Sequence, residues 1–134
     1  MLTLKQIRDW LKSQDSDLNN CITVGQIDGN KEKQVSIYPL KPSGDSQRIC
    51  IGGPEQTKYD TAWASVLVHW TKNAVLAEAE ANSVYDLFYG LAGVQMGTTP
   101  VISVDPGPGP IPVGTDAHGY HEYVIQLKIF YERI

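Results

Sequence analysis

The stretch SVLVHWTKNAVLAEAEANSVYDLF, residues 65–88, is the most informative about architecture, because its hydrophobic pattern changes in the middle. Residues 62–70 are largely apolar at both alternating positions, which predicts a central strand that is covered on much of both faces. Asn73 fits the N-cap of a helix that follows directly. Apolar residues then recur at spacings of four and three and predict a helical stripe that lies on a sheet, made of Ala77, Ala81, Val84, Phe88 and Leu91.

A first helix is predicted over Leu4 to Ser13. Thr3 followed three residues later by Gln6 fits a capping box, and apolar residues recur at helical intervals after it. The polar run SQDSDLNN, residues 13–20, should end this helix, because short polar side chains compete for the backbone hydrogen bonds that a helix needs.

The other predicted strands lie on both sides of the central one. CITVGQI, residues 21–27, and QVSIYPL, residues 34–40, flank an Asp28-Gly29 pair that favours the left-handed backbone of a hairpin turn. RICI, residues 48–51, is predicted as a short third strand. PVISV, residues 100–104, and HEYVIQLKIFYER, residues 121–133, complete the set.

The segment DPGPGPIPVGTDAHG, residues 105–119, is rich in proline and glycine. Prolines remove backbone donors and glycines loosen the chain, so we expect a loop without regular structure here, such as a flexible hairpin tip. The order of elements predicts an α+β fold, with residues 1–134 as a single domain. Two helices should pack against a mixed, mainly antiparallel sheet of about five to six strands.

Composition argues against several classes of protein. Hydrophobic residues make up 42% and charged residues 19% of the chain, as in an ordinary globular domain. The formal net charge is −4 and the basic residues form no block, which argues against tight nucleic-acid binding. No run approaches the roughly 18 apolar residues of a membrane span, and no signal peptide is evident. We expect a cytosolic protein in which Cys21 and Cys50 are reduced thiols.

Few residues have a pattern that suggests chemistry. Asp116, His118 and His121 offer one carboxylate and two imidazoles, ligand types of zinc and iron sites, but the two histidines are three apart across a loop. That spacing favours a surface loop over a metal site.

His69 stands near the end of the central strand, where a general base would stand in an α/β enzyme. No polar partner is near it in sequence, which favours a strand histidine hydrogen-bonded at the edge of the sheet.

Motifs for nucleotide binding and nucleophilic catalysis are missing. The strand-to-helix turn HWTKNA has no glycine whose backbone could approach a phosphate, and Ser65 and Ser83 lie outside any G-x-S-x-G elbow. These features favour a scaffold that acts by association. Two alternatives stay open: a small metal-dependent enzyme built on Asp116, His118 and His121, and a monomeric adaptor that binds an extended peptide at a sheet edge.

Three segments carry a resemblance to a known family. GQIDGNKEKQVSIYPL (residues 25–40), ICIGGPEQTKYD (49–60) and ASVLVHWTKNAVLAEAEANSVYDLF (64–88) resemble the minor capsid proteins of tailed bacteriophages and of prophages of Gram-positive bacteria. This group is similar to the siphophage tail terminators. The similarity runs from the first helix to the final strand and rests on the pattern and order of segments, while residues 105–119 depart from the family pattern.

The resemblance implies a virion structural protein of the tail and neck, with no catalytic residues and no cofactor. It implies a ring of this chain, expected to hold six copies, that caps the tail tube, stops its polymerisation and receives the head-completion or connector protein. DNA would pass through without specific binding, no membrane would be involved, and assembly would take place in the host bacterial cytoplasm. A closed ring needs complementary patches on opposite sides of one subunit. The candidate interface residues are Tyr85, Tyr89, Val124 and Phe130.

Overall fold

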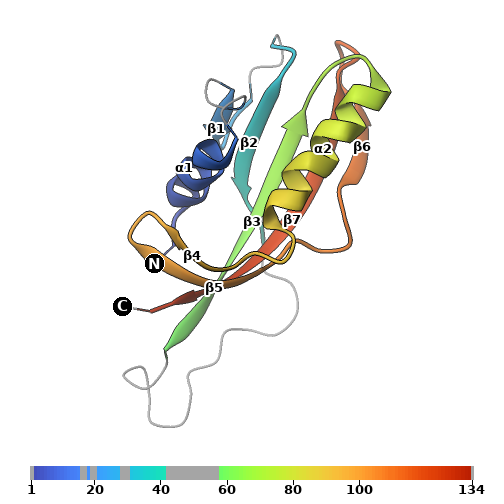
Figure 1. Ribbon diagram of the computed structural model, residues 1–134. Coiled ribbons are helices and arrows are strands. Elements are labelled where there is room, and N and C mark those ends of the chain that lie inside the picture. Colours follow the sequence, from blue (N-terminus) through green and yellow to red (C-terminus); the bar gives the residue numbers. More distant parts are fainter. Residues whose placement is uncertain (1, 16–17, 19–20, 28–30, 42–57, 134) are drawn as a thin grey trace.

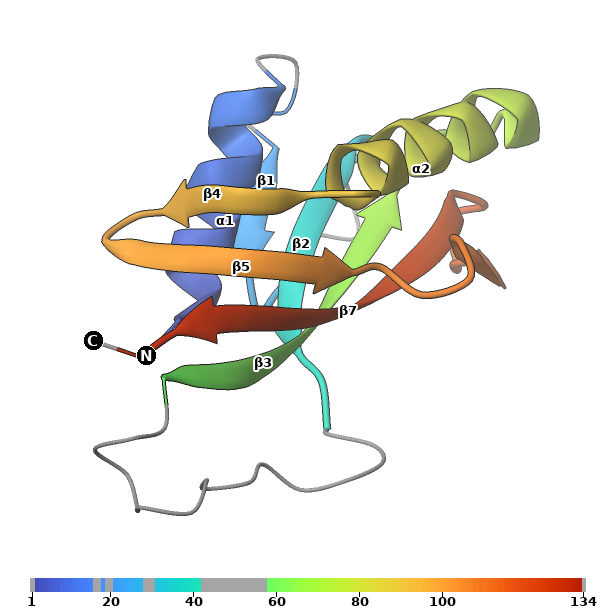
Figure 2. The same ribbon diagram turned by 60° about the horizontal axis from the view of Figure 1, so that its bottom comes forward.

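The computed structural model describes residues 2–15, 18, 21–27, 31–41 and 58–133, and it confirms the α+β class. A curled mixed sheet carries both described helices on one face (Figure 1, Figure 2). Its strands pair in the order β1-β2-β3-β7-β5-β4, and β6 pairs with β7 beside this path. The elements are α1 (Leu4–Gln14), β1 (Ile22–Val24), β2 (Gln34–Pro39), β3 (Tyr59–His69), α2 (Ala74–Phe88), β4 (Ala92–Met96), β5 (Thr99–Asp105), β6 (Ile111–Thr115) and β7 (His121–Glu132).

Strand β3 is central, as predicted, and lies between β2 and β7. Ala64, Val66 and Val68 point from it into the core, where they meet the buried stripe of α2. The rings of Trp10 on α1 and Phe88 on α2 lie 5.4 Å apart, so the two helices share one core. That core is lined from α2 by Ala77, Val84 and Phe88 and from β7 by Ile125, Leu127, Ile129 and Tyr131.

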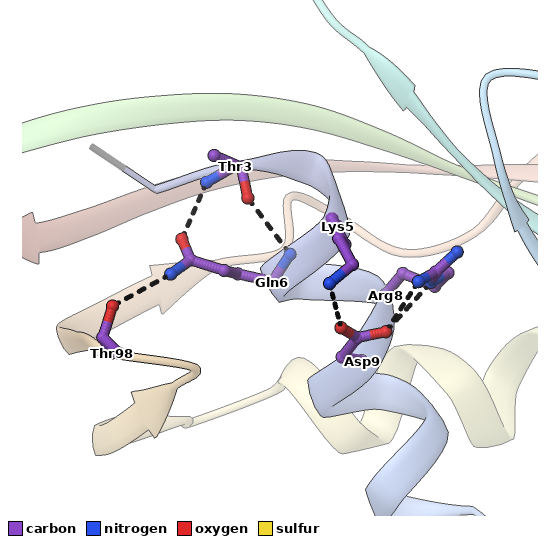
Figure 3. A network of polar contacts seen from close by, with 6 residues as sticks. All are labelled: Thr3, Lys5, Gln6, Arg8, Asp9 and Thr98. Carbon is purple, nitrogen blue, oxygen red and sulfur yellow. Dashed lines mark hydrogen bonds and ion pairs between the residues drawn. The ribbon is translucent and has the colours of Figure 1, made fainter.

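Helix α1 begins at the predicted capping box. Thr3 Oγ1 accepts a hydrogen bond from the Gln6 N–H at 3.3 Å, and Gln6 Oε1 accepts one from the Thr3 N–H at 3.0 Å. The Gln6 side-chain amide also donates to Thr98 Oγ1 at 3.4 Å, as Figure 3 shows. One side chain therefore caps α1 and ties it to the turn between β4 and β5.

Strand β4 is an element that the sequence patterns above do not predict. Its residues are mostly exposed and do not alternate clearly between apolar and polar. It pairs with β5 through a two-residue turn, because Met96 lies opposite Thr99. Gly97 has a φ of 64°, a backbone conformation that favours glycine, and a Cβ at this position would stand 3.0 Å from the Gln6 side chain and displace it. The Gly97-Thr98 pair was the sequence signal for this hairpin.

The predicted hairpin over residues 21–40 is wrong, because β1 runs parallel to β2 with Ile22 opposite Val35. Strand β1 ends after three residues, where Gly25 adopts a φ of 75°. The Gly25 N–H still donates to the Ile37 backbone oxygen at 2.9 Å, as the last bond of the parallel ladder, and the positive φ of Gly25 turns the chain out of the strand. The predicted Asp28-Gly29 turn and the strand predicted at 48–51 lie outside the described residues.

Part of the Pro/Gly-rich segment 105–119 forms a strand, which corrects the expectation of a loop without regular structure. Strand β6 pairs antiparallel with the start of β7, with Ile111 opposite Val124 and Thr115 opposite His121. Strand β5 pairs with β7 only from Lys128 to Tyr131. The start of β7 would therefore have unpaired backbone groups on this edge, and β6 supplies their partners.

Candidate functional site

A polar cluster closes the end of the sheet where β3 ends and β7 begins. His69 is 1% exposed, and its Nδ1 lies 3.3 Å from Glu122 Oε2 on the facing strand. Its Nε2 lies 3.0 Å from the Lys31 backbone oxygen and 3.7 Å from Asp116 Oδ2. The Tyr120 ring meets the imidazole edge-on, with the ring centres 5.2 Å apart. Both nitrogens of His69 are thus held by oxygen atoms of the protein, which makes the residue a tie between segments and a poor general base.

Sequence reasoning found His69 but missed its partners. Glu122 is 53 positions away along the chain, so no local pattern brings the two side chains together. The signal that could have found the pair was the register of two predicted strands, since β3 and β7 place His69 directly opposite Glu122. The preferred interpretation, a hydrogen-bonded strand histidine, agrees with the observed contacts, but His69 lies at the end of the central strand β3 and not on an edge strand.

Asp116, His118 and His121 do not gather into a metal site. Asp116 Oδ1 accepts hydrogen bonds from the N–H groups of His118 and Tyr120 at 2.9 and 3.0 Å, and so shapes the turn that leads into β7. His118 itself is exposed. Within the described ranges, no group of three or more His, Cys, Asp and Glu side chains is placed to hold a metal ion. The arrangement gives no geometric support to the metal-enzyme alternative.

The hydrogen bonds to Asp116 also set its acidity. Burial by itself raises the pKa of Asp116, but the N–H groups of Tyr120 and His118 and the nearby His69 imidazole lower it, so that the pKa lies below its ordinary value of 3.8. The carboxylate is therefore charged at neutral pH. Its role in the described structure is to hold the turn before β7 in place.

The edge strand β6 gives little support to the peptide-adaptor alternative. All of its residues are exposed, so its outer edge could meet an extended peptide. However, Pro112 has no backbone N–H, and the register shifts between Pro112 and Gly114. Proline and local register shifts are features that disfavour the addition of a further strand.

The four interface candidates fall on two different sides of the molecule. Tyr89, at the end of α2, is 70% exposed, and its ring centre lies 6.0 Å from that of Tyr85. Tyr85 is partly buried, and its hydroxyl donates to the Gly107 backbone oxygen at 2.8 Å, so it also holds the Pro/Gly-rich segment. Val124 and Phe130 are partly buried and point to the sheet face opposite the helices.

A groove around Phe130 is a feature that sequence reasoning missed. We call it the Phe130 groove; its volume is about 630 Å³, and it is lined by Lys58, Tyr59, Ile102, Phe130, Glu132 and Arg133, together with Ser103. The apolar part of its lining is accessible, since Tyr59 is 49% and Ile102 43% exposed. The groove exists because β5 lies beside the end of β7, which brings residues from three strands together.

Comparison with known proteins identifies the family to which this chain belongs. A family model described as bacteriophage tail terminator protein matches residues 3–133, nearly the whole chain. The chain belongs to the bacteriophage tail terminator family. The resemblance drawn from the sequence is thereby confirmed. Tail terminators are structural proteins of the virion tail, which interact with tail and head components.

One solved protein structure is similar to this tail terminator, with 17% sequence identity and a TM-score of 0.52. The match covers 97% of this chain and 89% of the other chain, and at this identity it shows a shared fold alone. A search of curated proteins gave no match. In the described part of the chain, neither helix combines the length and the apolar character needed to cross a membrane.

Proposed function

We propose that the protein forms a ring that caps the tail tube, stops tail polymerisation and presents the surface to which the head attaches. The family match carries this proposal, since it spans both helices and all the strands of the sheet. The ring is expected to hold six copies of a single-domain subunit. One face meets the tail tube protein, and the other meets a head-completion or connector protein.

The distribution of the candidate interface residues supports a ring. Tyr85 and Tyr89 lie on the helical side of the sheet, and Val124 and Phe130 lie on the opposite side. A subunit with different patches on its two sides can join its neighbours head to tail, and such contacts close into a ring when the rotation between neighbours fits. The proposed mechanism is assembly by complementary shape and charge.

We propose no chemical step and no cofactor. His69, the most buried titratable side chain of the polar cluster, has both ring nitrogens engaged by oxygen atoms of the chain. The formal charge of −4 and the scattered basic residues fit a passage that lets DNA through without holding it. Assembly is proposed to take place in the host bacterial cytoplasm.

Electron microscopy of tails tests the proposal. Tails are prepared from host cells that carry the phage genome with the gene intact, with the gene deleted, and with the deletion complemented from a plasmid. Deletion should give tails of uncontrolled length that do not join heads, and complementation should restore uniform tails. Uniform, head-joined tails from the deletion strain would refute the proposed function.

A further inference from the structure

We infer that neighbouring copies in the ring join through α2 of one copy and the Phe130 groove of the next. In this contact, the exposed ring of Tyr89 enters the groove, and Asp86 pairs with the cationic side chains of Lys58 and Arg133 at its rim. The inference rests on the proposed function, and it specifies the subunit contact that the ring needs.

The two surfaces lie on opposite sides of the same strands. Helix α2 packs on the core face of β3 and β7, through its buried stripe. Phe130 lies on β7 between the core residues Ile129 and Tyr131, so its side chain points to the other face, where the groove is. A contact between these patches is head to tail, because each copy offers α2 to one neighbour and the groove to another.

The sizes of the two patches are compatible, because the groove has room for the exposed Tyr89 ring. Tyr89 is the C-cap residue of α2, and its N–H donates to the Tyr85 backbone oxygen at 3.0 Å, so its backbone is fixed while its ring is 70% exposed. A groove of about 630 Å³ lies within the size range of pockets that take up drug-sized ligands, which is ample for one phenol ring. Phe130 and Tyr59 in the groove supply aromatic partners, and tyrosine is favoured at the energetic centres of interfaces.

The charges of the two patches are complementary as well. The acidic residues of α2 are Glu78, Glu80 and Asp86, and the helix contains no Lys or Arg. Asp86 and Tyr89 are three residues apart, so they share one side of the end of the helix.

The groove has the opposite character. Lys58 and Arg133 line it against the single carboxylate of Glu132, and Lys128 Nζ lies 5.2 Å from the centre of the Phe130 ring. Copies with a net charge of −4 repel each other overall, so local pairing of opposite charges favours the contact and fixes its register. Both halves of this pairing are on the one chain, which is why we assign a second copy as the occupant of the groove.

Site-specific crosslinking tests the contact. A photoreactive phenylalanine analogue replaces Tyr89, and the full-length protein is irradiated both on purified tails and free at high concentration. Crosslinked peptides from a second copy should come from the segments 58–59, 102–103 and 130–133. Crosslinks from residue 89 to the tube protein, to other segments of a second copy, or to no protein in either preparation would overturn the inference.

Charge reversal gives a second, independent test. Asp86→Lys and Arg133→Glu should each lower the yield of the self-crosslink at least tenfold, while the exposed controls Glu32→Lys and Lys12→Glu should leave it unchanged. An equimolar mixture of the Asp86→Lys and Arg133→Glu proteins should recover the yield. In that mixture, the reversed helix of one variant can meet the reversed groove of the other, and the unchanged helix can meet the unchanged groove. Circular dichroism verifies that every variant is folded.

The outcomes separate the inference from the proposed function. If the mixture fails to recover the crosslink, or if the reversals have no more effect than the controls, the contact is elsewhere. The proposed function would still stand provided that the deletion strain makes tails of uncontrolled length. Uniform, head-joined tails from the deletion strain would instead refute the proposed function, whatever the crosslinks show.

Discussion

Replacing Phe88 by alanine should destabilise the protein severely. The side chain is fully buried, and its ring lies 5.4 Å from that of Trp10, at the point where α2 meets α1. Truncating a buried phenylalanine costs about 3–5 kcal/mol, because it removes apolar contacts and leaves a cavity that neighbours fill only in part. Domains have total stabilities of about 5–15 kcal/mol, so the variant would be marginally folded.

Urea and thermal unfolding measure this loss. For a domain of this size, a loss of about 3–5 kcal/mol corresponds to a fall in Tm of about 10 °C or more. The matched control is Tyr89→Ala, which truncates the neighbouring aromatic residue but one that is 70% exposed. Its free energy of unfolding should change by less than about 0.5 kcal/mol.

A double-mutant cycle isolates the contact between the helices. The Trp10→Ala and Phe88→Ala changes should be coupled by about 0.5–1.5 kcal/mol, as expected for a packed aromatic pair. If Phe88→Ala costs no more than Tyr89→Ala, or if the two truncations are additive, then the helices do not share one core.

Three further perturbations probe other parts of the molecule. Thr3→Ala removes half of the capping box shared with Gln6 and should cost about 1 kcal/mol in urea unfolding, whereas Thr3→Ser should cost less. The pKa of Asp116 lies below its ordinary value of 3.8 in the folded protein, so its stabilising contribution is present above that pH and is lost as the pH falls through the lowered pKa. Asp116→Asn should therefore flatten the loss of stability below about pH 4. Burial and the Asp60 carboxylate raise the pKa of Tyr131 above 10.0. The contribution of its neutral hydroxyl to the free energy of unfolding is therefore complete below that pH and is lost as the pH rises through the raised pKa. Tyr131→Phe should reduce the fall in stability above about pH 10. Equal pH dependence of wild type and variant would contradict either assignment.

Errors in the predicted fold share a cause, which is that local signals do not specify partners. Residues 21–40 contain two apolar runs around an Asp-Gly pair, and a hairpin is the usual result of that pattern. In the structure, Gly25 ends β1 early and the chain returns to pair in parallel. Strand β6 is similar: Ile111, Val113 and Thr115 favour a strand, but Pro112 and Gly114 interrupt them, and the unpaired edge of β7 supplies the hydrogen-bond partners that order the segment.

In the candidate site too, local patterns predicted where single residues lie in helices and strands but not which side chains come together. The strand position of Phe130 was predicted from the pattern of residues 121–133, because such a pattern depends only on near neighbours in the chain. The 70% exposure of Tyr89 became known from the structure. The Phe130 groove could not be predicted, since it requires the end of β7 to lie between β3 and β5. Glu122 was likewise invisible as the partner of His69 until the register of the two strands was known.

Local sequence patterns were sufficient to predict α1, β3, α2 and β7, whereas the family was predicted from the resemblance of longer segments and confirmed by the family model. Their caps and hydrophobic periods are set by interactions within a few residues, and these are present before the chain folds. The direction of β1, the existence of β4 and β6, and the grouping of side chains at His69 and Phe130 became known only from the folded chain. Those features depend on backbone groups distant in sequence finding hydrogen-bond partners, which happens only when the sheet assembles.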